Sequence, residues 1–337
     1  MLNFNRKRSI SWLALISLLS LLVVVAGCGQ ANSTPVSSNE TAANYPNKTV
    51  TIIVGHAPGG STDVIARALQ PYLQKELGGT VVADNVDGGG GNTALSKLYK
   101  SPPDGYNILL TPFPSSILGE LVKDGDFKVK DFTYIHGVTG GDYNSIFVKY
   151  DSPYQDLKSL VEANKKGKLT LSGSGIGTNS HLTLNLLEKA SGSKFEYVSY
   201  DSGTEAAVAV AGGHTISGIG NIVSLKQLAD EKKIRILAVF GAQRHPNFPD
   251  IPTATELGYA NTAMDVSVGI IAPPKVPADI VEKLASALDK AIDSPEFKKQ
   301  AADLGSNIVS SGPEKFKQDA LSQYDEVNSL KDDLKPQ

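Results

Sequence analysis

The sequence has a single cysteine among its 337 residues, so it cannot form a disulfide framework or a four-cysteine zinc site. Charge of neither sign dominates, because 32 lysines and arginines stand against 35 aspartates and glutamates. Like charges never run for more than about three residues, which argues against a nucleic-acid partner, since phosphate binding needs a basic surface. The histidines lie far apart in the sequence, without the spacing of metal ligands, so no metal site is expected.

Several motifs with a defined chemistry are also missing. No Gly-Lys-Ser or Gly-Lys-Thr pair is present, which excludes a P-loop. No Gly-x-Ser-x-Gly pattern is present, which excludes the nucleophile elbow of α/β-hydrolases. No repeat is found, so a solenoid is not expected. The hydrophobic fraction of 41% and the charged fraction of 20% exclude wholesale disorder and a multispanning membrane protein. The length is that of two domains.

The one long apolar run lies near the start of the chain, between Trp12 and Ala26. At about 15 residues it fits the core of a signal peptide and is shorter than the roughly 20 residues of a membrane span. Arg6-Lys7-Arg8 precedes it, and no charged residue follows before Glu40. The run ends in Val25-Ala26-Gly27-Cys28, which resembles the lipobox of bacterial lipoproteins, where the cysteine thiol receives a diacylglyceryl group.

We therefore expect residues 1–27 to be a lipoprotein signal peptide and Cys28 to carry the lipid. Residues 28–45 are small, polar and featureless, which predicts a flexible tether. The protein would then be extracytoplasmic and lipid-anchored to the cell membrane. The alternative is an ordinary signal anchor with a chance cysteine.

From residue 46 onward, strand-like and helix-like segments alternate. Strands are predicted at Thr49–His56, Thr80–Val86 and Tyr106–Thr111, with helices after the first two. This βαβαβ order predicts a parallel sheet with crossover helices. A second alternating unit begins near residue 150, with strands at 168–173, 196–200, 215–219 and 234–240 and helices at 179–191 and 204–211. The C-terminal stretch is predicted to form three helices, Asp279–Ile292, Pro295–Leu304 and Pro313–Leu330.

Three glycine-rich loops lie between predicted strands and predicted helices. They are Ala57-Pro-Gly-Gly-Ser-Thr-Asp63, Ser172-Gly-Ser-Gly-Ile-Gly-Thr-Asn-Ser-His181 and Tyr200-Asp-Ser-Gly-Thr-Glu205. A helix start leaves backbone N–H groups unpaired and has positive dipole character, so it attracts anions. Ligands of open α/β sheets bind outside the carboxyl ends of the strands, where these loops fall. The loops therefore predict an anion site; the alternative is that they are only tight turns with capping residues.

The second loop also has a dinucleotide interpretation. Gly173-x-Gly175-x-x-Thr178 opens a helix, and Asp201 follows the next strand. However, the third glycine of the dinucleotide motif is missing, and the acid comes later than the roughly 20 residues expected. A dinucleotide-binding enzyme is therefore a remote alternative.

At five segments the sequence resembles the tripartite tricarboxylate transporter receptor family of solute-binding proteins. The segments are Ala57-Pro-Gly-Gly-Ser-Thr-Asp-Val-Ile-Ala-Arg67, Asp104-Gly-Tyr106, Gly175-x-Gly-Thr-Asn-Ser-His181, Ile251-Pro-Thr-Ala-Thr-Glu-Leu-Gly258 and Gly269-Ile-Ile-Ala-Pro-Pro274. They occur in the family order and together span nearly all of residues 46–330.

The resemblance implies an α/β, two-lobed, Venus-flytrap fold of periplasmic binding proteins. Each lobe would be a mainly parallel sheet flanked by helices, with the ligand in the cleft between the lobes. The chain would cross between the lobes twice, near residues 145 and 265. Lobe 1 would then comprise residues 46–145 and 266–337, and lobe 2 residues 146–265.

The resemblance also implies which residues hold the ligand. From the first loop they would be Gly59, Gly60, Ser61, Thr62 and Asp63, and from the end of the third strand Thr111. From the second lobe they would be Gly177, Thr178, Asn179, Ser180, His181 and Asp201. Asp63 and Asp201 have a simpler interpretation as helix-start carboxylates favoured by the dipole, and His181 as a first-turn residue.

The implied function is capture of a small organic anion, a di- or tricarboxylate, and its delivery to the permease subunits of a tripartite tricarboxylate transporter. No cofactor and no catalysis are implied, and the receptor would be a monomer. The alternative is an exported sensor subunit that reports the same ligand to a membrane kinase. Two departures from the family pattern, at Val86-Asp87 and around Ile216, leave the ligand's identity open.

Overall fold

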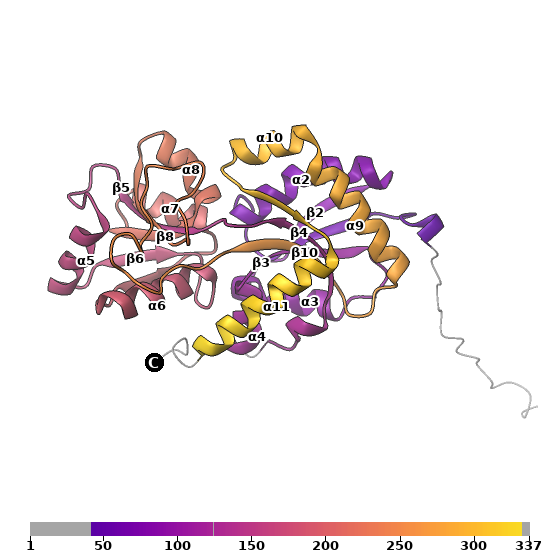
Figure 1. Ribbon diagram of the computed structural model, residues 1–337, viewed down its shortest axis with the longest axis horizontal. Helices are drawn as coiled ribbons and strands as arrows, with labels where there is room; N and C mark the ends of the chain where they lie inside the picture. Colours follow the sequence, from indigo (N-terminus) through magenta and orange to yellow (C-terminus); the bar gives the residue numbers. More distant parts are fainter. Residues whose placement is uncertain (1–41, 124, 332–337) are drawn as a thin grey trace, which may run out of the picture. The chain divides into compact units, whose positions relative to one another are not determined.

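The computed structural model describes residues 42–123 and 125–331 of the chain. The expected signal peptide, the expected lipidation residue Cys28 and most of the expected tether lie outside these residues. The described chain forms two β-sheets, each covered by helices on both faces (Figure 1). Among these residues, no helix combines the length and the apolar character that crossing a lipid bilayer requires.

The first sheet has six strands. They are β1 (Val50–Val54), β2 (Val81–Asn85), β3 (Asn107–Phe113), β4 (Thr133–Thr139), β10 (Ser267–Ala272) and β11 (Ile308–Ser311). Their order across the sheet is β11-β4-β10-β3-β1-β2. β1 pairs in parallel with β2 and β3, whereas β10 is antiparallel to β3 and β4, and β11 is antiparallel to β4.

Helices cover both faces of this sheet because successive apolar residues of its strands point to opposite sides. Ile52 and Ile270 belong to the core on one face, and their neighbours Ile53 and Ile271 belong to the core on the other. The first core is closed by α2 (Ser61–Leu77), α9 (Ala278–Asp293) and α10 (Pro295–Asp303). The second is closed by α3 (Asn92–Tyr99), α4 (Ser115–Leu121) and α11 (Pro313–Leu330). Short 3-10 helices lie at η1 (Ala42–Asn44), η2 (Gly89–Gly91) and η3 (Val129–Asp131).

The second sheet has five strands in the order β7-β6-β8-β5-β9. They are β5 (Asn144–Lys149), β6 (Thr170–Gly173), β7 (Glu196–Ser199), β8 (Ser217–Asn221) and β9 (Ile234–Val239). β6 is parallel to β7 and β8, and β5 is antiparallel to β8 and β9. Helices α5 (Leu157–Lys166) and α6 (Asn179–Ser191) pack on one face, and α7 (Gly203–Ala211) and α8 (Ile222–Asp230) on the other.

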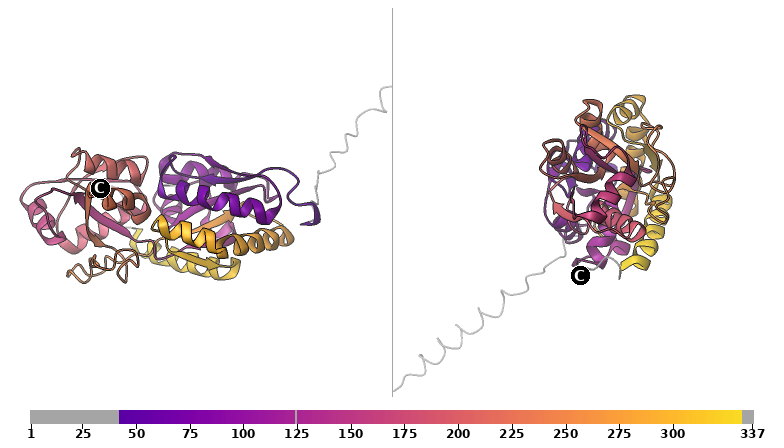
Figure 2. Two further views of the ribbon diagram at one scale, coloured as in Figure 1. Left: turned by 90° about the horizontal axis from the view of Figure 1, so that it is seen from above. Right: turned by 90° about the vertical axis from the view of Figure 1, so that its left-hand side faces the viewer.

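We call the first sheet with its helices lobe 1 and the second sheet with its helices lobe 2. The chain passes from lobe 1 to lobe 2 between Thr139 and Asn144, and it returns between Val239 and Ser267. As a result, the C-terminal α9 and α11 lie beside the N-terminal elements of lobe 1 (Figure 2).

The sheets are mixed, although each was expected to be mainly parallel. Parallel pairs arise where a crossover helix returns the chain to the starting edge of the same sheet. β5 and β10 instead enter directly from the other lobe, without a crossover helix, so they run against their neighbours. The α/β architecture of two helix-flanked sheets otherwise agrees with the prediction.

The expected tether is too long at its C-terminal end. Its last residue, Tyr45, is buried in the first core. Its ring lies 4.9 Å from that of Tyr106, and its hydroxyl donates to the carbonyl of Gly105 at 2.7 Å. Burial of this aromatic ring makes Tyr45 part of the folded lobe.

Candidate functional site

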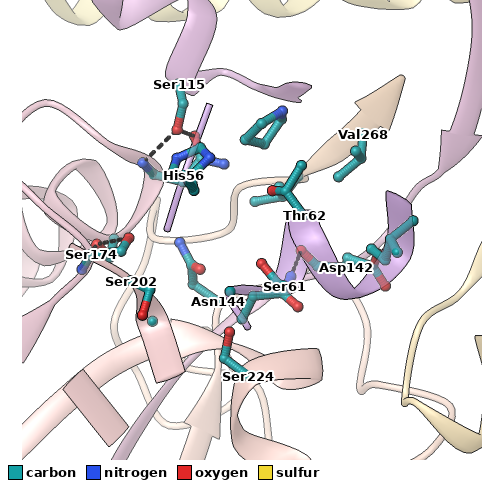
Figure 3. Close-up of a pocket in the computed structure, with 18 residues that line it drawn as sticks. His56, Ser61, Thr62, Ser115, Asp142, Asn144, Ser174, Ser202, Ser224 and Val268 are labelled. Atoms are coloured by element: carbon teal, nitrogen blue, oxygen red, sulfur yellow. Dashed lines mark hydrogen bonds between the residues drawn. The ribbon is translucent and has the colours of Figure 1, made fainter. Parts of the chain in front are cut away.

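A cavity of about 50 Å³ lies where the two lobes meet (Figure 3). Its walls come from residues that follow the carboxyl ends of β1, β6 and β7, from the end of β8, from helix starts and from the two connections between the lobes. The lining residues are His56, Gly60, Ser61, Thr62, Ile65, Pro112, Ser115, Asp142, Asn144, Ser174, Asn179, Ser180, Ser202, Gly203, Asn221, Ser224, Val266 and Val268.

Four helices of eight or more residues begin at this cavity. The lining residues at their starts are Ser61 and Thr62 of α2, Asn179 and Ser180 of α6, Gly203 of α7, and Asn221, the N-cap of α8. Each helix start has the positive end of a helix dipole and backbone N–H groups without an intrahelical partner. Among the residues that the structure describes, no lysine or arginine lines the cavity. The positive potential there comes from backbone groups, and hydroxyl and amide side chains add further donors.

Two of these four helix starts, one in each lobe, have no side-chain cap. The N-cap residues of α7 and α8, Ser202 and Asn221, accept hydrogen bonds from the backbone of their own first turns. The N-cap residues of α2 and α6, Gly60 and Thr178, make no such side-chain bond. The first turn of α2 is therefore where a bound anion gains most from the backbone, because the first N–H of α6, that of Asn179, already donates to Ser115 Oγ at 3.0 Å.

The first loop is held in shape by Asp63, which is 2% exposed. Its carboxylate accepts hydrogen bonds from the Gly59 N–H at 2.9 Å, from Arg67 Nε at 3.0 Å and from Asn85 Nδ2 at 2.9 Å. Burial by itself would raise the pKa of Asp63, but these hydrogen bonds outweigh it and lower the pKa below its ordinary value. Gly59 has a φ of +80°, which glycine adopts without strain. Asp63 braces the loop without lining the cavity.

The second loop is held by neutral groups instead. Thr178 Oγ1 donates to the carbonyl of Gly175 at 2.8 Å, and Ser180 Oγ accepts from the Ser174 N–H at 3.0 Å. The Gly177 N–H donates to Nδ1 of His181 at 3.3 Å. Burial lowers the pKa of His181 below its ordinary value, so the ring is neutral at pH 7 and can accept this bond.

The two lobes touch around the cavity. Thr204 Oγ1 of lobe 2 donates to the carbonyl of Gly59 in lobe 1 at 2.8 Å. On another wall, Ser115 Oγ of lobe 1 donates to Asn179 Oδ1 at 2.9 Å and accepts from the Asn179 N–H at 3.0 Å. Leu182 of α6 is part of the second lobe-1 core. These contacts describe a closed arrangement of the two lobes.

Of the residues described by the structure, two with titratable side chains, His56 and Asp142, line the cavity. Burial raises the pKa of Asp142 to about 6, although hydrogen bonds from Asn307 and Ser306 act in the opposite direction. Burial lowers the pKa of His56, with a smaller effect of the same sign from Lys123 and an opposing effect from Asp87. At pH 7, therefore, His56 is neutral and Asp142 is mostly ionised.

Five of the twelve residues proposed from the sequence line the cavity, namely Gly60, Ser61, Thr62, Asn179 and Ser180. The other seven do not. Gly59, Asp63, Gly177, Thr178 and His181 shape the two loops, as described above. Thr111 is buried, and its Oγ1 lies 2.7 Å from Ser116 Oγ. Asp201 is exposed, and its neighbour Ser202 faces the cavity instead.

Several lining residues were not proposed from the sequence. Ser174 and Ser202 lie within the quoted glycine-rich loops, and Asn221 follows the same strand-to-helix pattern, so the rule used for the first loop would have found them. His56 directly precedes the first loop. Asp142 carries no local signal, because its place in the site depends on how the connection between the lobes runs.

Comparison with known proteins identifies a family model and relatives that resemble this chain. Residues 65–330 match the family model described as tripartite tricarboxylate transporter family receptor. A protein of Cupriavidus necator, named "UPF0065 protein in gbd 5′region", is 30% identical over 263 residues, which are 77% of this chain and 80% of the relative.

Solved structures show the same fold. That of the periplasmic binding protein BugD superposes with a TM-score of 0.81 at 28% identity, over 87% of this chain and 100% of the other. MatC from Rhodopseudomonas palustris, solved with bound malate, superposes with a TM-score of 0.80 at 23% identity, over 85% of this chain and 100% of the other. The likeness confirms the predicted two-lobed fold of periplasmic binding proteins.

Proposed function

Because this chain belongs to the tripartite tricarboxylate transporter family of receptors, we propose that it captures a small di- or tricarboxylate between its lobes and delivers it to a membrane permease. The protein binds and releases its ligand without making or breaking a bond in it. The observation that carries the proposal is the cavity at which four helices begin. No lysine or arginine of residues 42–123 and 125–331 lines this cavity. Such a site favours a small anion through backbone groups.

The ligand's first carboxylate binds at the start of α2. Gly60 brings the backbone close, and the backbone N–H groups and hydroxyls of Ser61 and Thr62 donate to the oxygens. Asn179 and Ser180 contribute from lobe 2. Because the ligand makes both sets of contacts only when the lobes meet, it shifts the population toward the closed arrangement.

A screen of carboxylates tests this proposal. The purified protein is heated with mono-, di- and tricarboxylates, malate among them, and with amino acids and NAD as comparators. A ligand at 100 times its Kd raises the stability by about 2.7 kcal/mol, which a thermal-shift measurement detects readily. We expect at least one di- or tricarboxylate to stabilise the protein and NAD to have no effect. Stabilisation by NAD alone, or by none of the carboxylates, contradicts the proposal.

We further propose that the mature protein is a monomer anchored at the outer face of the cell membrane by a lipid on Cys28, after removal of residues 1–27. The lipobox-like Val25-Ala26-Gly27-Cys28 supports this, and so does the extracytoplasmic location implied by the family. Cys28→Ser removes the thiol that is acylated, so the variant should leave the membrane fraction or keep its signal peptide. A Cys28→Ser protein that is still processed and still membrane-bound contradicts the anchor.

A further inference from the structure

Asp142 lines the cavity, and its side chain is held from lobe 1 while its main chain is held from lobe 2. It lies in the connection between β4 and β5 and is 1% exposed. Its carboxylate accepts hydrogen bonds from the Asn307 N–H at 2.9 Å and from Ser306 Oγ at 3.1 Å, both in lobe 1. Its main-chain carbonyl accepts from Asn221 Nδ2 of lobe 2 at 3.1 Å. Two hydrogen bonds from lobe 1 therefore hold the carboxylate of a residue that lines the cavity.

An anion in this cavity acts on Asp142 in a defined direction. Burial already raises the pKa of this carboxyl to about 6. A second negative charge nearby, in a site of low dielectric, disfavours the ionised carboxylate and raises the pKa further. Since no lysine or arginine in the described part of the chain lines the cavity, no side-chain cation from that part offsets the repulsion.

His56 responds in the same direction. It lines the cavity, and its Nδ1 is buried without a hydrogen-bond partner within the described part of the chain. Burial lowers its pKa, so the ring is neutral before an anion binds. A carboxylate close to the imidazole favours the protonated form and raises this pKa. Both titratable groups of the cavity therefore gain proton affinity when an anion arrives.

From this geometry we propose that the receptor takes up its carboxylate together with a proton, held chiefly by Asp142 and secondarily by His56. The inference rests on the proposed function, since it needs an anionic ligand in the cavity. It makes ligand affinity depend on pH: the complex is tightest in mildly acidic surroundings and loosens as the pH rises toward 8.

The other titratable and charged groups near Asp142 and His56 do not account for the proposed proton uptake. Tyr143, next to Asp142, has a pKa raised by burial, with contributions from Asp265 and Asp142, so it stays protonated across this range. Lys226, which lies near Gly305, is paired with Asp230. Around His56 the charged groups are Asp87 and Lys123. The pKa of Lys123 is lowered by burial, but the residue does not line the cavity.

Isothermal titration calorimetry measures directly how many protons the protein takes up when the ligand binds. Binding of malate, or of the carboxylate that the screen selects, is measured at pH 6.5 in phosphate and in imidazole buffers, whose protonation enthalpies differ. We expect an uptake of about half a proton or more per ligand, and a Kd that rises by up to about tenfold for each pH unit between 6 and 8. Asp142→Asn keeps the shape of the side chain and removes its titration. It should lose most of the uptake and most of the pH dependence.

Two further variants sharpen the assignment. His56→Asn places an amide near the position of Nδ1 without a titrating ring, and it should remove the smaller remaining part of the uptake. Asp265→Asn is the control, because burial raises the pKa of Asp265 as well, but this residue does not line the cavity. It should leave both the uptake and the pH dependence as in the wild-type protein.

The outcomes separate this inference from the proposed function. Tight binding without proton uptake, at a Kd constant from pH 6 to 8, overturns the inference and leaves the proposed function intact. Undiminished uptake in a protein that carries both Asp142→Asn and His56→Asn puts the proton on the ligand and also overturns it. If no carboxylate in the screen binds, both the proposed function and the inference are wrong.

Discussion

The glycine-rich loops before α2 and α6 both bring a helix start to the cavity, yet they are built in different ways. In lobe 1 a buried carboxylate, Asp63, holds the loop from behind, and Gly60, Ser61 and Thr62 face the cavity. In lobe 2 hydroxyls hold the loop, and only Ser174, Asn179 and Ser180 face the cavity. A carboxylate such as that of Asp63 can lie close to an anion site when hydrogen-bond donors of its own lobe compensate its negative charge. Both loops also contact the other lobe, the first through the carbonyl of Gly59 and the second through Asn179, and in both cases the contact is made by neutral groups.

The largest effect on ligand affinity is expected from adding a side chain at Gly60 in the first loop. In Gly60→Val the new Cβ would lie 3.2 Å from the carbonyl of Ala57 and 3.5 Å from Cβ of Ser202 in the other lobe. The two methyl groups then push the loop away from its closed position. Losing one or two charge-assisted hydrogen bonds, at about 1.5–3 kcal/mol each, weakens carboxylate binding by about tenfold to more than ten-thousandfold. Calorimetry measures the Kd.

Gly312→Val is the matched control for this variant. Gly312 and Gly60 are both N-cap glycines with extended backbone angles, φ −64° and ψ 176° against φ −70° and ψ 162°. A Cβ at Gly312 meets nothing within 4 Å, and Gly312 does not line the cavity. The control should bind as the wild-type protein does. If Gly60→Val is folded and also binds the carboxylate normally, the first loop does not form the anion-binding site.

The corresponding test of the lobe-2 loop is Asn179→Asp. This places a carboxylate at the start of α6, at a residue that lines the cavity, where it repels an anion. At an effective dielectric of about 20 such repulsion is about 4 kcal/mol at 4 Å and less at longer range. We therefore expect binding to weaken by about tenfold to hundredfold at pH 7. The melting temperature of the protein should not fall, because an acidic side chain in the first turn of a helix interacts favourably with the helix dipole.

Ala278→Asp is the control for net charge. Ala278 is exposed at the start of α9 and does not line the cavity. The Ala278→Asp variant carries the same added charge at the same kind of position. Its affinity for the carboxylate should stay within about twofold of the wild-type value. Equal losses in the two variants would mean that overall charge, and not the lobe-2 loop, sets the affinity.

A third variant tests the brace of the first loop. Asp63→Asn should lower the free energy of unfolding by about 1–3 kcal/mol at pH 7, because the buried charge-assisted hydrogen bonds are lost. The folded-state pKa of Asp63 lies below its ordinary value. Its contribution is therefore fully present above about pH 4 and is lost as the pH falls through the lowered pKa. Urea unfolding of both proteins at pH 7 and at pH 3 should show a gap that shrinks in acid. A gap that stays constant with pH contradicts a charged brace.

The same contrast explains how much of the fold the sequence could predict. The helix at Asn179–Ser191 was predicted with the bounds it has, because its apolar spacing and its flanking loops are local signals. β11 (Ile308–Ser311) was not predicted, since the C-terminal stretch was expected to be helical throughout. A strand of four residues has too little pattern of its own, and only its pairing with β4 defines it. β4, β5 and β10 have six or seven residues and were missed for another reason: they flank the two crossings between the lobes, where strand follows strand without the intervening helix on which the prediction relied.

The site shows the same limit. Of two adjacent residues, the family resemblance implied Asp201, but Ser202 caps α7 and lines the cavity while Asp201 stays exposed. Residues at the helix starts follow a local rule and could be predicted, as Gly60 and Ser61 were. Asp142 could not, because its position depends on hydrogen bonds from Asn307 and Asn221, which come from different lobes.

The smallest effect is expected at the bond that joins the two lobes beside the first loop. Thr204→Val keeps the shape of the side chain and removes the hydroxyl that donates to the carbonyl of Gly59. A single neutral hydrogen bond contributes about 0.5–1.5 kcal/mol, so ligand affinity should fall by about twofold to tenfold. The loss comes from a smaller closed population, since Thr204 does not line the cavity.

Small-angle X-ray scattering distinguishes this cause from a direct loss of ligand contacts. At saturating carboxylate the wild-type protein and Thr204→Val should reach the same reduced radius of gyration, because excess ligand restores closure in both. At equal subsaturating ligand, the variant should remain more extended. Thr204→Ser keeps the hydroxyl and should follow the wild-type curve. If Thr204→Val and Thr204→Ser are both indistinguishable from the wild-type protein, this bond does not favour closure, and the ligand alone joins the two loops.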